Sequence, residues 1–291
     1  MDSVEYHFPV LVREIVEVIR DELESLDEIV FVDCTLGLGG HSSEIIPCLS
    51  KNSSIFLLDR DKESIEIALK RIGSLLKDRE NVKVLNISFS RFFENLELNG
   101  KMLVVLADLG ISYYQIKNQS GFSFNRDTFL DMRYDKNQSV TAFDIINTFN
   151  FQELYDIFYR VFENKKLVNK IVSVIVVDRE RNEIRTTYDL NKSISKVVSF
   201  KFLKDILQKV YLALRIFVNR ELEELTDLLN FFKNYKQNFL LLIISYHSLE
   251  GKIIKDFIKT SGLTFKKIKP SKDEISRNKP SRSAVLWVIK K

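Results

Sequence analysis

A glycine-rich turn is the segment of this sequence best suited to bind a small ligand. Residues 33–41 read Asp-Cys-Thr-Leu-Gly-Leu-Gly-Gly-His and follow an apolar, β-branched run at residues 29–32. A buried strand that ends in a glycine turn and re-enters as a helix brings bare backbone close to a ligand and directs free N–H groups at it. Gly39 and Gly40 are adjacent, whereas the dinucleotide motif spaces its glycines as G-x-G-x-x-G. The turn therefore predicts a nucleotide-like ligand other than NAD.

Asp59 is the second candidate ligand-binding residue, because it directly follows the apolar run at residues 55–58. Open parallel sheets bind their ligands at the carboxyl ends of the strands. Asp59 lies 20 residues after Gly39, a spacing at which an acidic side chain meets ribose hydroxyls in nucleotide sites. The alternative is that Asp59 or Asp61 caps the following helix. We favour the cap for Asp61 and the ribose contact for Asp59.

Asp108 follows another apolar run, residues 102–107, and precedes Gly110 and Ser112. A carboxylate at this position can accept a hydrogen bond from a substrate amine. It can equally be a turn or cap residue, and the residues alone leave both interpretations open.

Two further polar residues have both a functional and a structural interpretation. His247 follows the buried run at residues 239–244, where a histidine could orient a base or transfer a proton, although a lone histidine is more often structural. Arg133, in Leu-Asp-Met-Arg-Tyr-Asp, could pair with a buried carboxylate or contact a phosphate.

Hydrophobic patterning indicates which elements position these residues. Strand and helix patterns alternate over the first hundred residues, which predicts an α/β fold with a doubly wound parallel sheet. The expected strands are residues 29–32, 55–58, 82–87, 102–107 and 239–244, with further strand-like stretches at 263–268 and 284–289. The expected helices are residues 10–19, 42–49, 62–76, 143–149, 151–162, 167–179, 203–232 and 249–258. Residues from about 113 to 205 are mostly helix-like, so the sheet domain is interrupted by a helical insert.

Composition excludes several classes of protein. The chain has 291 residues, ordinary fractions of hydrophobic and charged residues, and no apolar run near the roughly 20 residues that span a bilayer. We therefore expect a cytoplasmic protein without a membrane segment. Two cysteines and three histidines without ligand spacing argue against a metal site. Residues 251–291 contain twelve Lys and Arg against three Asp and Glu, so this tail could contact phosphates or be a solvated surface.

The order of these motifs resembles that of the bacterial 16S rRNA (cytosine(1402)-N(4))-methyltransferases, over almost the whole chain. The motifs that carry the resemblance are His7–Leu11, Asp33–His41, Leu58–Asp61, Ala107–Ser112, Gly121–Phe124, Leu130–Arg133, Ala213–Ile216 with Asn219 and Glu221–Leu222, Ser245–Glu250 and Arg282–Ala284. The resemblance implies a Rossmann-like methyltransferase domain with a seven-stranded, mostly parallel sheet, formed by residues 1–112 and 206–291. It also implies that the helical insert, residues 113–205, recognises the substrate.

The same resemblance implies S-adenosylmethionine as cofactor and a cytidine of 16S rRNA, in the decoding region of the small ribosomal subunit, as substrate. The implied cofactor contacts are Gly39, Gly40, His41, Asp59, Phe89, Asp108 and Gln115. Our hypothesis for catalysis gives Asp108 the role of accepting a proton from N4, helped by Ser112, with His247 as a second candidate for orienting the base or transferring a proton. The implied RNA contacts are Tyr113, Arg133, Arg215, Asn219 and Arg282. It leaves open whether the protein is a homodimer.

Other functions stay open at this point. A methyltransferase that acts on DNA, protein or a small molecule would need the same cofactor residues. A non-catalytic RNA-binding or assembly factor could keep the fold, although intact Gly39, Asp59 and Asp108 argue against it. An NAD-dependent oxidoreductase is disfavoured by the adjacent glycines.

Overall fold

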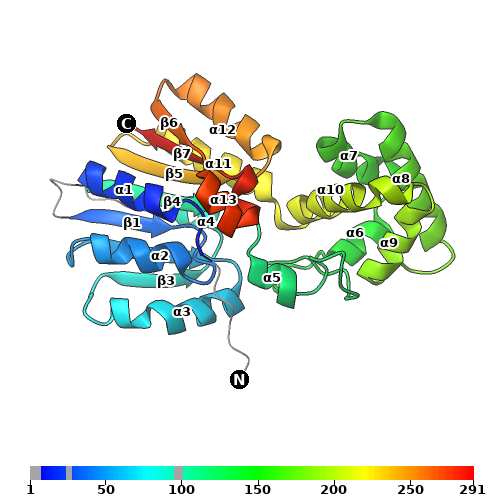
Figure 1. Cartoon of the computed structure of the whole chain (residues 1–291), viewed down its shortest axis with the longest axis horizontal. Helices are drawn as coiled ribbons and strands as arrows, with labels where there is room; N and C mark the ends of the chain where they lie inside the picture. Colours follow the sequence, from blue (N-terminus) through cyan, green and yellow to red (C-terminus); the bar gives the residue numbers. More distant parts are fainter. Residues whose placement is uncertain (1–7, 24–27, 95–100) are drawn as a thin grey trace. The chain divides into compact units, whose positions relative to one another are not determined.

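A mostly parallel sheet lies between the helices of the unit that contains both ends of the chain (Figure 1). The computed structural model describes residues 8–23, 28–94 and 101–291, and within them seven strands pair in the order β3-β2-β1-β4-β5-β7-β6. The strands are β1 (Ile29–Asp33), β2 (Ser54–Asp59), β3 (Val82–Asn86), β4 (Met102–Asp108), β5 (Phe239–Ser245), β6 (Thr264–Ile268) and β7 (Val285–Lys290). Strands β1 to β5 pair in parallel, and β7 runs antiparallel to both β5 and β6. The predicted α/β fold class is confirmed.

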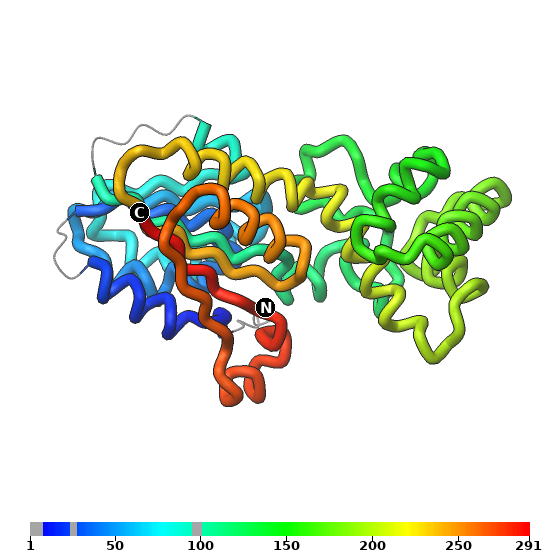
Figure 2. Tube along the Cα trace, turned by 90° about the horizontal axis from the view of Figure 1, so that it is seen from above, coloured from blue at the N-terminus to red at the C-terminus, as the bar shows by residue number. Residues whose placement is uncertain are grey.

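Helices cover both faces of this sheet, as the view in Figure 2 shows. One face carries α1 (Val12–Leu23), α2 (Gly40–Ile45) and α3 (Lys62–Leu76), and the other α4 (Phe89–Glu94), α11 (Glu221–Asn234) and α12 (Ser248–Ser261). Side chains of a strand alternate between the faces, so Phe31 packs among α1, α2 and α3 while Val30 and Val32 pack on the opposite side. Since both faces are covered, the central strands are apolar at nearly every position.

The helix expected at residues 42–49 differs in its bounds. It begins two residues earlier, at Gly40, and its α-helical part ends at Ile45. Residues Ile46–Cys48 form a 3₁₀ turn, η1, with a proline at one of its first two positions. Pro47 has no backbone N–H to donate, which explains why the α-helix does not continue.

The described residues divide into two compact units, one formed by residues 1–110 and 222–291 and the other by residues 111–221. The second unit is helical. Its helices are α5 (Tyr113–Asn118), α6 (Ala142–Thr148), α7 (Phe151–Phe162), α8 (Lys165–Arg179), α9 (Thr187–Ser195) and α10 (Phe200–Asn219). The predicted insert ends at residue 205, whereas Leu207, Val210 and Leu214 of α10 are buried in the core of the helical unit. None of the described helices has the length and apolar character needed to cross a membrane.

The single helix expected at residues 203–232 is two helices, α10 and α11, because the chain turns at Arg220. Arg220 adopts a left-handed conformation (φ 51°), and its N–H bonds the carbonyls of Ile216 and Phe217 as a helix C-cap. Both helices keep the 3.6-residue pattern across the break, which is why periodicity alone joined them.

Asn219, at the end of α10, holds the loop around Met132. Its Oδ1 accepts a hydrogen bond from Tyr134 N–H (2.9 Å), and its Nδ2 donates to the carbonyls of Met132 (2.8 Å) and Arg215 (3.0 Å). The side chain is fully buried. Met132 has a positive φ of 61°, so the loop is held in a conformation that methionine rarely adopts.

We expect Asn219→Ala to destabilise the helical unit by about 2 kcal/mol or more, because it leaves a buried N–H and a buried carbonyl without these bonds. Urea unfolding followed by circular dichroism measures the loss. Asn137→Ala is the matched control, since Asn137 lies in the same loop and is exposed. Equal stability of the two variants would contradict the assigned role.

Candidate active site

The glycine turn follows β1 and is closely packed on its outer side. Gly37 and Gly39 have positive φ values of 50° and 75°. A Cβ on Gly39 would lie 3.1 Å from Ile72 and 3.3 Å from Ala68, both on α3. A Cβ on Gly40 would lie 3.3 Å from Pro9. The missing side chains therefore allow the turn to approach α3 and the segment before α1, in addition to freeing its backbone.

A chain of hydrogen bonds fastens this turn to the end of β4. The buried carboxylate of Asp33 accepts hydrogen bonds from Thr35 N–H (3.1 Å) and Ser42 Oγ (2.6 Å). Thr35 Oγ1 in turn accepts the backbone N–H of Asp108 (2.7 Å). Burial raises the pKa of Asp33 even though these bonds favour its charged form. The carboxyl ends of β1 and β4 are thereby held together.

Asp108 lies at that junction, and its carboxylate contacts two side chains from other segments. Tyr246, just after β5, donates its hydroxyl to Asp108 Oδ1 (2.7 Å). His41 Nδ1 lies 3.7 Å from Asp108 Oδ2. Burial raises the pKa of Asp108, and the contacts with His41 and Tyr246 oppose that rise. About a quarter of the side chain, 26%, stays exposed, so a ligand can reach this carboxylate.

His41 is oriented from its other side by the segment that precedes α1. Its Nε2 lies 2.8 Å from the carbonyl of Val10, and since a carbonyl only accepts, Nε2 carries a hydrogen; Nδ1 faces Asp108. That segment is itself held by α13 (Lys272–Arg277), because Leu11 N–H donates to Glu274 Oε1 (2.8 Å). Asn278 Nδ2 also donates to the carbonyl of Phe8 (3.2 Å). Residues far apart in the sequence thus fix one imidazole.

Asp59 accepts two backbone hydrogen bonds at the end of β2. Its Oδ2 accepts from Gly37 N–H (2.7 Å) in the glycine turn, and its Oδ1 accepts from Asp61 N–H (2.9 Å). Burial raises the pKa of Asp59 to about 6. Asp61 caps α3 by accepting Glu63 N–H (3.1 Å), so the cap favoured for Asp61 is confirmed. The ribose contact expected of Asp59 stays a prediction.

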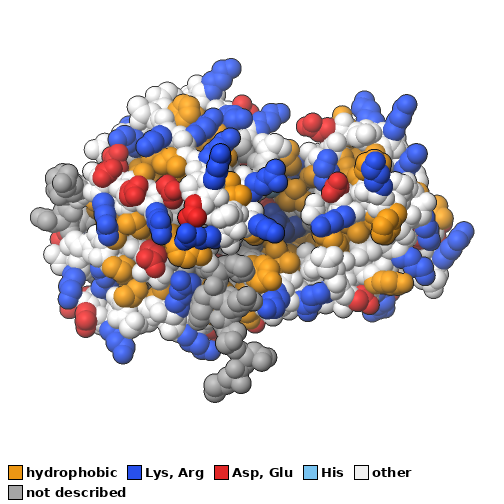
Figure 3. Space-filling view, viewed as in Figure 1, with side chains coloured by type: hydrophobic (Ala, Val, Ile, Leu, Met, Phe, Trp, Pro, Cys, Tyr) orange, Lys and Arg blue, Asp and Glu red, His pale blue; other side chains and the backbone are white. Residues whose placement is uncertain are grey.

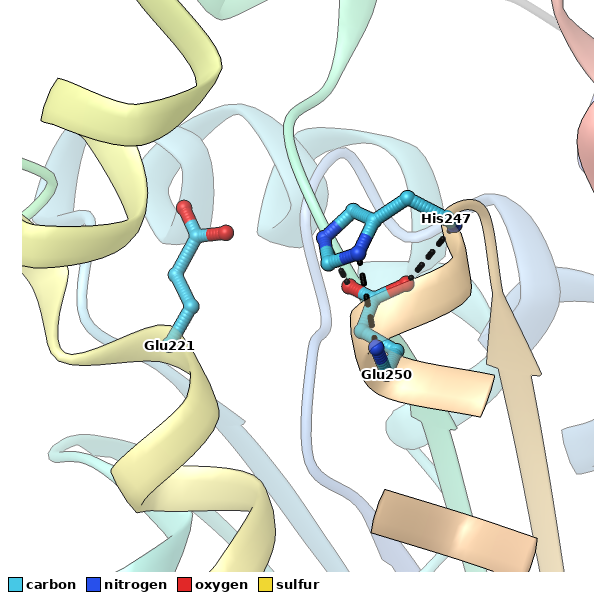
Figure 4. Close-up of side chains that lie close together, drawn as sticks. All are labelled: Glu221, His247 and Glu250. Carbon is cyan, nitrogen blue, oxygen red and sulfur yellow. Dashed lines mark hydrogen bonds and ion pairs between the residues drawn. The ribbon is translucent and has the colours of Figure 1, made fainter. Parts of the chain in front are cut away.

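His247 is the N-cap of α12 and is paired with Glu250 (Figure 4). Glu250 N–H donates to His247 Nδ1 (3.4 Å), and Glu250 Oε2 accepts His247 N–H (3.2 Å) and Tyr246 N–H (2.8 Å). His247 Nε2 lies 3.2 Å from Glu250 Oε1. The geometry gives His247 a structural role at the helix start, and its catalytic role stays a prediction. Glu221, also drawn in Figure 4, pairs with Arg215 of the helical unit (2.8 Å).

Ser112 and Gln115 form a capping box at the start of α5. Ser112 Oγ accepts Gln115 N–H (3.2 Å), and Gln115 Oε1 accepts Ser112 N–H (3.1 Å). Gln115 is buried and belongs, with Ser112, to the helical unit. Tyr113 between them is 44% exposed. The cofactor and catalytic roles expected of Gln115 and Ser112 stay predictions.

The residues expected to bind RNA differ in how accessible they are. The Arg133 guanidinium bonds Asp131 Oδ1 (2.7 Å) and the carbonyl of Gln138, which is the ion-pair interpretation left open above. Arg215 makes a two-bond ion pair with Glu221 (2.8 and 3.0 Å), and Asn219 is buried. Arg282 is exposed in the 3₁₀ turn η2 (Lys279–Ser283).

Phe89, expected to pack on an adenine ring, begins α4 and is 7% exposed. It joins the apolar cluster between the sheet and α11. It follows β3, whose last residue, Asn86, pairs with Asp59 in the sheet register. Its contact with a cofactor stays a prediction.

The sequence analysis did not single out Tyr246 or Thr35 as functional residues. The strand register could have pointed to Tyr246, because Asp108 pairs with Ile244 and Tyr246 follows that residue by two positions. Thr35 gave no comparable signal, since its hydroxyl is one of many polar groups in the turn.

The strand order, with β7 inserted antiparallel between β5 and β6, defines a Rossmann-like class I methyltransferase fold. The glycine turn, Asp59 and Asp108 lie at the carboxyl ends of its strands, where such folds bind ligands. The chain belongs to the MraW methylase family, whose model matches residues 4–263.

Relatives of similar length carry one common name. The chain is 36% identical to the ribosomal RNA small subunit methyltransferase H of Caldicellulosiruptor saccharolyticus, over 98% of this chain and 99% of that protein. It is 37% identical to the protein of the same name from Borreliella afzelii, over all of both chains. A third, from Hydrogenobaculum sp., is 35% identical over 98% of this chain and 95% of that protein. The resemblance inferred from the motifs is confirmed.

Tyr246→Phe tests whether the tyrosine hydroxyl keeps Asp108 ionised. Removing a donor to the charged form should raise the pKa of Asp108 further, by about one unit or more, since a hydrogen bond to a charged group contributes about 1.5–3 kcal/mol. A carbon NMR titration of the aspartate carboxyls measures the shift, with Asp108→Asn identifying the resonance. Tyr235→Phe is the control, because the Tyr235 hydroxyl donates to Gln237 and not to Asp108. An unmoved Asp108 titration would show that the hydroxyl does not tune this group.

Proposed function

We propose that this protein transfers a methyl group from S-adenosylmethionine to the exocyclic N4 of a cytidine in small-subunit ribosomal RNA, at position 1402 of 16S rRNA. The single observation that supports it most is the Asp108 carboxylate at the end of β4, which accepts the Tyr246 hydroxyl and is still partly exposed, while Thr35 Oγ1 accepts the Asp108 backbone N–H. The names of full-length relatives support the RNA substrate. The motif resemblance supports the cytosine N4 position.

The residues at the strand ends fit the proposed cofactor. Each oxygen of Asp59 accepts one backbone N–H, so a lone pair on each is left for a pair of ribose hydroxyls. Gly39 and Gly40 have no side chain where the turn packs against α3 and Pro9, so the turn can sit close to these segments and offer its backbone to a ligand at the strand ends. When bound there, S-adenosylmethionine supplies an electrophilic methyl group carried on a sulfonium. The chain's own residues then hold and orient the acceptor.

Asp108 has the chemistry that an amine acceptor requires. The lone pair of cytosine N4 is delocalised into the ring, so N4 must lose a proton as its bond to the methyl carbon forms. Burial raises the pKa of Asp108, which makes its carboxylate a stronger proton acceptor than an exposed one. The Tyr246 hydroxyl donates to the carboxylate, and His41 Nδ1 lies 3.7 Å from its other oxygen, which favours alignment of the reacting atoms.

The basic residues of the tail support a nucleic-acid substrate. Lys266, Lys267, Lys269 and Lys272 lie in and after β6, the edge strand of the sheet, and Arg282 follows in η2. Lys266, Lys267 and Lys272 are exposed. Cationic side chains on one edge can hold a phosphate backbone without reading its sequence.

Asp108→Asn tests the proposed reaction. It keeps the shape of the side chain but removes the proton acceptor, so we expect methyl transfer to small-subunit RNA to fall by about 10²-fold or more. Mass analysis of digested nucleosides identifies the product as N4-methylcytidine, and calorimetry checks that the cofactor still binds.

Asp256→Asn, an exposed position on α12, is the matched control and should keep full activity. Wild-type methylation of DNA or protein but not of ribosomal RNA would overturn the substrate. Absence of cofactor binding in the wild type would favour an assembly factor instead.

A second prediction follows from Asp59. Its pKa is raised to about 6, so its ionised form, which can accept two hydroxyls, is complete above that pH and is lost as the pH falls through about 6. We expect the affinity for S-adenosylmethionine to decrease below pH 6, by up to tenfold per unit. Asp59→Asn should bind weakly at all pH values without this decrease. Calorimetric titrations across pH measure both; an equal decrease in Asp59→Asn would assign the pH dependence to another group.

A further inference from the structure

The first turn of α10 carries the most exposed large apolar side chain of the described residues. Phe200 is 92% exposed, and Phe202, on the same turn, is 55% exposed. Lys201 lies between them with its Nζ 5.5 Å from the Phe202 ring centroid, and Lys204 follows one turn after Phe200. We call these four residues, Phe200, Lys201, Phe202 and Lys204, the Phe200 patch.

The position of Phe200 on the helix is that of a core residue. Leu203, Leu207, Val210 and Leu214 follow it at spacings of three and four, and all contact the core of the helical unit. Phe200 continues that stripe beyond the end of the core. Burying a phenylalanine contributes about 1.5–3 kcal/mol, and this helix leaves two of them in solvent. Phe200 and Phe202 are two positions apart, so their rings project from opposite sides of the helix start, and each has a lysine near it: Lys204 one turn after Phe200, and Lys201 over the Phe202 ring. Single exposed apolar residues are ordinary, but two exposed rings that each lie beside a lysine have the composition of a binding surface.

We infer that the Phe200 patch binds single-stranded RNA, with the two rings stacking on unpaired bases and Lys201 and Lys204 contacting phosphates. This binding rests on the proposed RNA substrate, and it specifies that the bound RNA is single-stranded and that α10 binds it. Stacking on aromatic side chains flanked by positive charge is how proteins hold unpaired nucleotides.

Charge favours RNA over a protein partner at this surface. Lysine is depleted at protein interfaces, whereas both lysines of the patch are exposed beside the rings. Asp205 is the acidic residue that adjoins the patch along the helix, and Lys209 follows it. Figure 3 shows apolar and basic side chains interspersed over the helical unit on one face of the molecule. A methyltransferase that modifies a base edge also needs that base unpaired.

Binding of a short fluorescent RNA strand, followed by anisotropy, tests the inference without requiring methyl transfer. Phe200→Ala/Phe202→Ala should weaken binding of the single strand by about tenfold, given 1–3 kcal/mol per stacked base. Its binding to the same strand annealed to its complement should change less. Phe200→Tyr/Phe202→Tyr, which keeps the rings, should bind as the wild type, and Phe200→Leu/Phe202→Leu should not. Lys201→Gln/Lys204→Gln should reduce the salt slope by about 0.7 per lysine.

The matched control is Phe151→Ala. Phe151 is the first residue of α7, as Phe200 is of α10, and is 39% exposed in the same unit, but Gln152 and Tyr155 stand where α10 has Lys201 and Lys204. Single-strand affinity within twofold of the wild type in Phe200→Ala/Phe202→Ala, or equal losses in Phe151→Ala, would overturn the inference. So would full binding by the leucine variant, or a dimer in sedimentation that the alanine variant dissociates. If single strands bind through the patch while ribosomal RNA is not methylated, the inference stands and the proposed function fails.

Discussion

The adjacency of β1 and β4 is the constraint on which the site depends. The two strands are neighbours, but the chain places β2 and β3 on the far side of β1 and β5 on the far side of β4. The strand order reverses direction between β1 and β4, and ligands of such sheets bind at the carboxyl ends of the strands at that point. The turn after β1 must therefore lie next to Asp108. The hydrogen bonds from Asp108 N–H to Thr35, and from Thr35 N–H to Asp33, hold that meeting point. Without them the glycine turn and the proposed base would belong to separate loops.

Much of this frame is predictable because it depends on patterns that are local in the sequence. Buried parallel strands are continuous apolar runs, and β1, β4 and β5 were expected within about one residue of their bounds. Helix α3 and helix α7 have the expected bounds, since each begins after a capping residue and has an amphipathic face. The acidic residues that end β2 and β4 could be proposed as ligand-binding residues for the same reason, because the end of a buried strand can be located from the sequence.

Contacts between distant segments could not be read in this way. The position of Tyr246 against Asp108 depends on the pairing of β4 with β5, which are separated by the whole helical unit. Arg133 and Arg215 have the charge of phosphate ligands, but their partners, Asp131 and Glu221, use that charge within the fold. The break at Arg220 depends on a left-handed backbone conformation, and the sequence has no glycine or asparagine at residue 220 that would predict it. The residue types can be taken from the sequence, but only the tertiary structure shows which charged side chains already pair with another residue of the chain.

The buried carboxylates at the strand ends connect stability with function. Burial raises the pKa of Asp33, Asp59 and Asp108, so each charged form is less favourable in the folded protein than in water. Because their folded pKa values are raised, ionisation of these groups costs stability as the pH rises above the usual carboxyl range. Asp33 offsets part of this cost by accepting two hydrogen bonds, one from Thr35 N–H in the turn and one from Ser42 Oγ in α2. Each oxygen of Asp59 accepts one backbone N–H, and Asp108 Oδ1 accepts the Tyr246 hydroxyl. In the proposed function, the ribose hydroxyls and the substrate amine would donate further hydrogen bonds that offset the remaining cost of ionisation. In the proposed function, these two carboxylates therefore favour ligands that donate hydrogen bonds to them.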